Sequence, residues 1–174
     1  MERKSLGEKM AMWGIGPLFG AGAAAHFLYG VLGRPFWASL LFPVNESVFE
    51  HLKLGAFPTL LYAWLGGAIL KKKQGHINGW YKGQWTATCV CLTSILLLHY
   101  FYEGALGRHG PWGDVLIFFL SVILGQLAAA RVIKSSEEKD RWAMVLMMLL
   151  VLLLAAGTFW PPELPLFEDP TAGA

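Results

Sequence analysis

The sequence predicts an all-α membrane protein, a polytopic bundle of about five transmembrane helices. Hydrophobic residues make up 55% of the 174 residues and charged residues only 15%, whereas soluble domains carry about 25% charged residues. The mean hydropathy is +0.47, and the few charges are grouped between long apolar stretches. This composition excludes a disordered tail, a nucleic-acid binder and a disulfide scaffold. It makes the lipid bilayer the first expected partner.

Five apolar stretches are each long enough to cross a hydrocarbon core, which takes about 20 helical residues. We expect a single membrane domain with spans at about residues 10–32, 48–70, 85–106, 112–133 and 142–160. None of these stretches alternates polar and apolar residues as a membrane β-strand does, and a helix satisfies its backbone groups without water. Residues 161–174 are rich in proline and acids, so we expect an extended extracytoplasmic tail there. A fold-back of this tail, in which Glu168 or Asp169 covers the polar residues of the bundle, is a further hypothesis.

The first stretch contains Gly16 and Gly20, a spacing that allows close approach between helices. We therefore expect these two glycines inside the bundle. The connection over residues 33–45 contains a short apolar piece of its own. Both an interfacial half-turn and a shallow re-entrant loop fit this connection, and the sequence leaves both open.

The basic residues predict how the chain is oriented in the membrane. Eleven of the 14 Lys and Arg residues lie before the first stretch, in the connection after the second stretch, or at the end of the fourth stretch and in the connection after it. Under the positive-inside rule this side is cytoplasmic. The N-terminus is then inside and the C-terminus outside a cell membrane, either a plasma membrane or an inner membrane.

Ionisable residues gather at a common depth near the outer end of the predicted bundle. Three of them lie equally far from a basic flanking residue: His26 from Lys9, His99 from Lys82, and Asp114 from Arg131. A rise of about 1.5 Å per residue puts them about 25 Å above the cytoplasmic face. Ionisable residues within spans are rare and usually functional. We therefore expect a polar pocket at the outer leaflet that binds a small ligand or a metal ion, lined by His26, Asn45, Glu46, Glu50, His51, Lys53, His99, Glu103 and Asp114.

Residues 43–53, PVNESVFEHLK, form the most polar segment inside the apolar region. A helix start explains part of this segment, because Asn45 or Ser47 can cap a helix and Ser47 with Glu50 has the spacing of a capping box. Capping needs only one acid. A functional site therefore explains Glu50, His51 and Lys53 better than capping does.

This block also carries a resemblance to a family of small multi-pass bacterial membrane proteins with a PVNESxxEHLK motif, known only as a domain of unknown function. The likeness extends to the HFLY segment at residues 26–29, to residues 114–125 and to the proline-rich tail. It implies a multi-pass architecture and no activity. The positions it marks are His26, Asn45, Glu46, Glu50, His51, Lys53, Asp114 and Asp169, whereas His99 and Glu103 fall outside its pattern.

A metal site is one function that these residues fit. Imidazole and carboxylate groups are ligands that zinc takes, and three protein ligands leave a fourth position for water. The expected ligands for zinc or another divalent metal are His26, His51, His99 and Glu50. Glu103 or Asp114 could supply the carboxylate in place of Glu50. A metal-bound water would make the protein a membrane hydrolase that acts on a lipid or a peptide.

Two other functions fit the same residues, so the sequence leaves open whether the protein is an enzyme. Intramembrane acids and histidines also mark proton- or solute-coupled transport paths, and Pro17 and Pro58 supply helix breaks of the kind that transporters use. Alternatively, the polar groups satisfy one another and fix the helix register. The protein is then a structural scaffold that binds a second copy of itself or another membrane protein.

Overall fold

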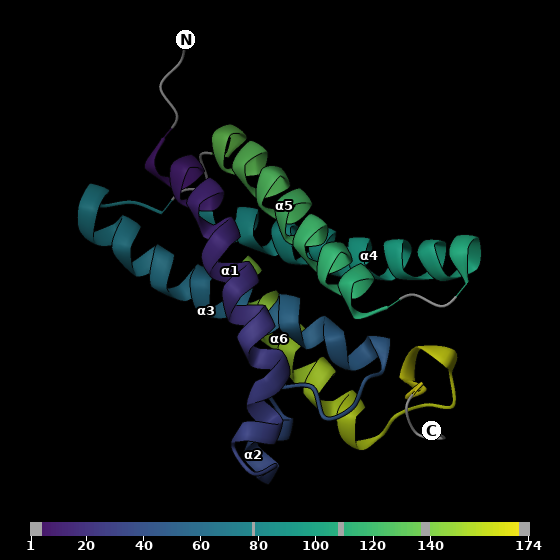
Figure 1. Ribbon diagram of the computed structural model, residues 1–174. Coiled ribbons are helices and arrows are strands. Elements are labelled where there is room, and N and C mark those ends of the chain that lie inside the picture. Colours follow the sequence, from purple (N-terminus) through teal and green to yellow (C-terminus); the bar gives the residue numbers. More distant parts are fainter. Residues whose placement is uncertain (1–4, 78, 108–109, 137–139, 171–174) are drawn as a thin grey trace.

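The structure is a computed structural model, which describes residues 5–77, 79–107, 110–136 and 140–170. It contains the helices α1 (Leu6–Val31), α2 (Phe36–Ser39), α3 (Val48–Gln74), α4 (Trp80–Leu106), α5 (Pro111–Ser135) and α6 (Arg141–Phe159), and the 3-10 turn η1 (Pro165–Phe167) (Figure 1). No strand occurs in these ranges. The predicted all-α fold is confirmed.

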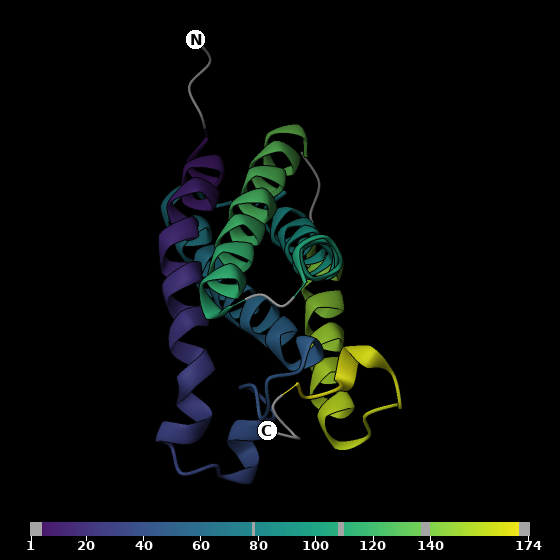
Figure 2. The ribbon, with the colours of Figure 1, turned by 45° about the vertical axis from the view of Figure 1, so that its right-hand side comes forward.

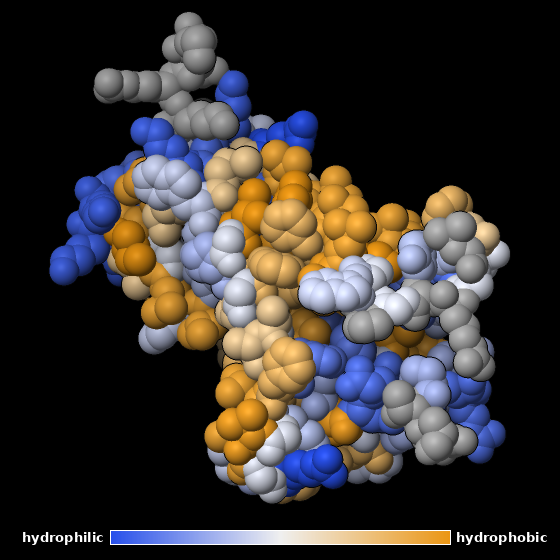
Figure 3. Space-filling view, viewed as in Figure 1, coloured by the Kyte–Doolittle hydropathy of each residue, from blue (hydrophilic) through white to orange (hydrophobic). Residues whose placement is uncertain are grey.

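Helices α3, α4, α5 and α6 are long and apolar enough to cross a membrane, by length and composition. The 26-residue helix α1 is not among them, since its glycines, Pro17 and His26 lower its hydropathy. It nevertheless runs beside α5 (Figure 2). Figure 3 shows a hydrophobic surface between two hydrophilic ends. The chain is a multi-pass membrane protein whose environment is a lipid bilayer.

Glycines decide where the helices approach closely. A Cβ added to Gly22 of α1 would lie 2.9 Å from the Leu54 carbonyl oxygen of α3, and one added to Gly125 of α5 would lie 2.6 Å from the Ala87 carbonyl oxygen of α4. The expectation for Gly16 and Gly20 was wrong, because no heavy atom lies within 4 Å of a Cβ built on either residue. Both glycines are on the exposed face of α1.

The interface between α4 and α5 contains a buried pair of amides, Gln84 and Gln126. Each amide nitrogen donates to the other side chain's oxygen, at 3.4 and 3.2 Å.

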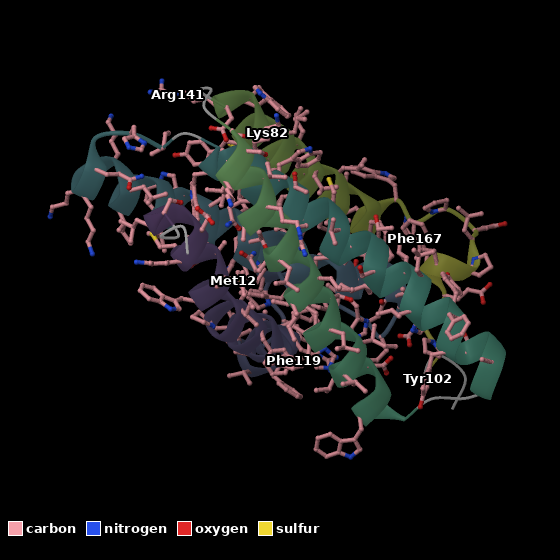
Figure 4. All side chains as sticks on the ribbon, turned by 90° about the horizontal axis from the view of Figure 1, so that it is seen from above. Met12, Lys82, Tyr102, Phe119, Arg141 and Phe167 are labelled. Atoms are coloured by element: carbon pink, nitrogen blue, oxygen red, sulfur yellow. The ribbon has the colours of Figure 1, made fainter. Side chains whose placement is uncertain are left out.

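At the start of α4, Asp140 accepts a hydrogen bond from the Lys82 backbone N–H at 2.5 Å. Because Gly79, the N-cap of α4, has no side chain to cap this helix, the carboxylate of Asp140 does so from the start of α6. Figure 4 shows Lys82 and Arg141 at one end of the molecule, away from Tyr102 and Phe167.

At the opposite end, residues 33–45 contain the single helical turn α2, which begins after Gly33 and Arg34 adopt positive φ angles of 79° and 58°. The tail was expected to be extended, but residues Pro165–Phe167 form a turn that returns to α3 (Figure 1). There Phe167 stacks on Phe49 with ring centroids 4.2 Å apart. This ring contact joins the tail to the start of α3. The rest of the predicted tail, residues 171–174, lies outside the described residues.

Candidate metal centre

Close packing of α1 against α3 brings His26 and His51 together. Gly14 of α1 contacts Tyr62 of α3, and Gly22 contacts Leu54, so the two helices run antiparallel. His26 lies one turn after Gly22, and His51 lies one turn before Leu54. The two imidazole rings therefore meet, with centroids 5.2 Å apart.

Glu46 completes a cluster of three side chains that have metal-ligand chemistry. Its carboxylate oxygens lie 3.9 Å from His26 Nε2 and 3.5 Å from His51 Nε2. One ligand atom from each of the three residues lies within 4.8 Å of the other two. Zinc bonds of about 2.0–2.2 Å in a tetrahedron put neighbouring ligand atoms about 3.3 Å apart. The present separations of up to 4.8 Å exceed this value by up to about 1.5 Å, so the side chains would have to rotate inward to surround one ion.

The backbone selects the tautomer of His51. Its Nδ1 lies 2.8 Å from the Ser47 carbonyl oxygen, and a carbonyl can only accept, so Nδ1 is the donor. In the neutral ring, Nε2 then carries the lone pair on the side of Glu46. A hydrogen bond of this kind on the far nitrogen is typical of metal-binding histidines, because it fixes the ring orientation and the tautomer.

The start of α3 explains why the Glu46 carboxylate is available. Ser47 is the N-cap, and its hydroxyl accepts a hydrogen bond from the Glu50 N–H at 3.3 Å. The Ser47 N–H donates to the Asn45 side-chain oxygen at 3.1 Å. In the predicted capping box the Glu50 side chain would accept the hydrogen bond from the Ser47 N–H. Asn45 accepts it instead, so only the Ser47 half of the box forms. With capping complete, Glu46 turns toward the two histidines.

A family model matches residues 1–174, the whole chain, and its description is "Family of unknown function (DUF6512)". The chain belongs to this family. No curated protein and no solved structure matches it. Membership therefore brings no activity with it, and the site of this DUF6512 member has to be interpreted from its own geometry.

Two of the predicted pocket residues, Glu50 and Lys53, form a separate buried network. The Lys53 ammonium donates to Glu50 Oε2 at 2.8 Å, to the Ser39 carbonyl oxygen at 2.8 Å and to Thr158 Oγ1 at 2.5 Å. Thr158 in turn donates to Glu50 Oε1 at 2.8 Å. All three ammonium protons have acceptors, and the carboxylate faces its counter-charge rather than the histidines. The carboxylate in the cluster of possible metal ligands is therefore Glu46 and not the predicted Glu50.

The remaining predicted pocket residues form a third group, at the contact between α4 and α5. They are His99, Glu103 and Asp114. His99 Nε2 lies 3.6 Å from Glu103 Oε2, and His99 Nδ1 lies 3.8 Å from Asp114 Oδ1. His99, a predicted metal ligand, is thus placed with these acids and not with His26 and His51. Figure 3 shows hydrophilic side chains gathered below the start of α5, between α1 and the C-terminal tail.

Sequence reasoning did not find Thr158 or Ser39. Thr158 is a polar residue near the end of the otherwise apolar helix α6, and this isolation is the signal that identifies it. Ser39 acts through its backbone carbonyl, and its hydroxyl donates to the Phe36 carbonyl oxygen at 2.7 Å. No side-chain pattern in the sequence reveals a backbone acceptor of this kind.

Proposed function

We propose that this multi-pass membrane protein binds a divalent transition-metal ion, with zinc as the best fit, between His26, Glu46 and His51. The observation that carries the proposal is the convergence of two imidazoles and one carboxylate from α1 and the start of α3. Two nitrogens and one carboxylate oxygen are a ligand set that zinc takes. Magnesium and calcium prefer oxygen ligands.

His26 has a second, buried ring nitrogen besides the Nε2 that faces Glu46. Its Nδ1 is buried and has no hydrogen-bond partner among the described residues. Buried polar atoms in native structures nearly always have a partner. A water held at Nδ1 would remove the cost of leaving this nitrogen unpaired and would orient the ring for a metal ion at Nε2.

We place the site on the external side of a plasma or inner membrane. Most of the Lys and Arg residues belong to the end of the bundle that holds the N-terminus of α1 and the C-terminal ends of α3 and α5. Under the positive-inside rule, that end is cytoplasmic. The His26, Glu46 and His51 cluster is at the other end, where an ion would arrive from outside the cell.

A titration with zinc tests this function. The full chain, purified in detergent and stripped of metal, competes for zinc with a chromogenic indicator. We expect one tight ion per chain, and we expect tight binding to be lost in His26→Ala and His51→Ala and weakened in Glu46→Gln. His76→Ala, in an exposed histidine after α3, is the matched control and keeps the tight ion. Equal zinc binding in the wild type and His51→Ala would contradict the proposal.

Partial exposure favours a second candidate, a metal-dependent hydrolase. The side chains of His26, Glu46 and His51 are 27%, 48% and 25% exposed, so the fourth coordination position of a bound ion is accessible to water. Catalytic zinc sites have three protein ligands and such a water. Hydrolysis of a lipid ester or peptide by the zinc-loaded protein, lost in His51→Ala, would establish this activity. An inactive zinc-loaded protein would leave the metal site with a binding role alone.

A further inference from the structure

His99 and Glu103 have the geometry of a two-ligand chelate on one helix. They lie one turn apart on α4, where side chains at this spacing are neighbours. His99 Nε2 is 3.6 Å from Glu103 Oε2, close to the separation of about 3.3 Å between two ligand atoms of one tetrahedral zinc ion. A small rotation of the exposed Glu103 side chain would bring both atoms to one ion.

Asp114 lies on the other side of the same imidazole. Its Oδ1 is 3.8 Å from His99 Nδ1, and it comes from α5. Metal-binding histidines usually direct their second N–H to a carboxylate or a carbonyl, which orients the ring and raises its basicity. His99 thus has an acid at each nitrogen, one placed as a fellow ligand and one placed to orient the ring. His51 has the same two-sided arrangement, with the Ser47 carbonyl in the orienting position.

Among the described residues, the charges beside His99 favour a cation over an anion. Glu103 and Asp114 are 55% and 46% exposed and flank a single imidazole. The positive charge of Lys53 is buried and paired with Glu50. The two carboxylates beside this imidazole contribute a negative potential, which attracts a divalent ion and repels a phosphate headgroup.

We propose that His99 and Glu103 bind a second divalent transition-metal ion, with Asp114 as the positioning residue behind the imidazole. This site has two direct protein ligands, and the first cluster has three, so it binds zinc more weakly than the first cluster does. None of its residues belongs to the His26, Glu46 and His51 cluster. The two sites can therefore be tested separately.

The zinc titration of the full chain in detergent, continued to higher zinc concentrations, is the test. We expect two classes of bound zinc in the wild type. His99→Ala and Glu103→Gln remove the weaker class and leave the tight one, whereas His26→Ala does the reverse. Asp114→Asn retains the weaker class with an affinity about 10–100-fold lower. Glu163→Gln, in the exposed tail, is the matched control and leaves both classes unchanged.

Glu103 keeps this test decisive, because its exposed side chain can be changed without loss of folding, whereas His99 is largely buried. Zinc binding that is insensitive to Glu103→Gln and to a folded His99→Ala would overturn the second site. Equal zinc affinity in Asp114→Asn and the wild type would overturn the positioning role of Asp114. A single class of zinc that depends on His99 and Glu103 would support the second site and contradict the first.

Discussion

The Lys53 ammonium lies 2.8 Å from the Glu50 carboxylate, and both side chains are almost completely buried. Burying two charges is favourable only when their partners and hydrogen bonds are complete. Here Ser39 supplies a carbonyl from α2 and Thr158 a hydroxyl from α6. The pair therefore joins the end of α2, the start of α3 and the end of α6 at the end of the bundle that holds His51.

Replacing Lys53 by Met should destabilise the protein by about 3–5 kcal/mol, since it leaves the Glu50 charge buried without a partner. Unfolding in detergent, followed by circular dichroism, measures this loss. The double variant Lys53→Met/Glu50→Leu should recover much of the stability, because it removes both buried charges. Lys71→Met, in an exposed residue of α3, is the control. Wild-type stability in Lys53→Met alone would show that the pair does not stabilise the fold.

Alanine at Gly22 should destabilise the protein by about 1–3 kcal/mol through overpacking. The added Cβ would lie 2.3 Å from the Phe118 ring and 2.9 Å from the Leu54 carbonyl oxygen. It should also weaken zinc binding, because α1 must move away from α3 and carry His26 with it. Gly16→Ala is the matched control on the same helix, since a Cβ there meets no atom within 4 Å. Equal unfolding temperatures for the two variants would refute the close contact at Gly22.

The amide pair in the α4–α5 interface should show coupling in a double-mutant cycle. Gln84→Leu and Gln126→Leu should each cost about 0.6–1.7 kcal/mol, the range measured for hydrogen bonds between membrane helices. The double variant should cost little more than either single one, because each single change leaves the other amide unpaired. Unfolding of all four proteins in the same detergent gives the coupling energy. Strictly additive effects would mean that the two amides do not interact.

Asp140 should make stability depend on pH. It lies outside the membrane-spanning helices, and burial raises the pKa of its carboxyl above the ordinary value of 3.8, although the hydrogen bond from the Lys82 N–H partly offsets this. Below the ordinary pKa the group is protonated in both states. As the pH rises through the raised pKa, the folded state has to hold a buried charge, so the stabilising contribution is lost.

Unfolding temperatures of the wild type and Asp140→Asn, measured from about pH 4 to about pH 7, test this dependence. The wild type should lose stability relative to Asp140→Asn as the pH rises. Glu163→Gln, in an exposed acid, should keep the wild-type profile. Parallel curves for the wild type and Asp140→Asn would contradict the assignment.

Hydropathy and charge predict the helical membrane fold and place the polar residues at one end of the bundle. They do not determine which carboxylate pairs with which histidine or lysine. Glu46 and Glu50 are both near His51 in sequence, and the choice between them depends on Thr158, more than a hundred positions away in α6. Likewise, spacing identifies small residues on α1, but contacts with Phe118 and Leu54 make Gly22, and not Gly16, the residue of close approach.

The X-ray absorption spectrum of the protein loaded with one equivalent of zinc tests most directly whether His26, Glu46 and His51 form a metal site. We expect only nitrogen and oxygen neighbours, at about 2.0–2.2 Å, with the outer-shell scattering of two imidazoles. His51→Ala should remove one of these imidazoles. A sulfur shell at about 2.3 Å, as the free cysteines Cys89 and Cys91 would give, or zinc that stays in solution, would contradict the account.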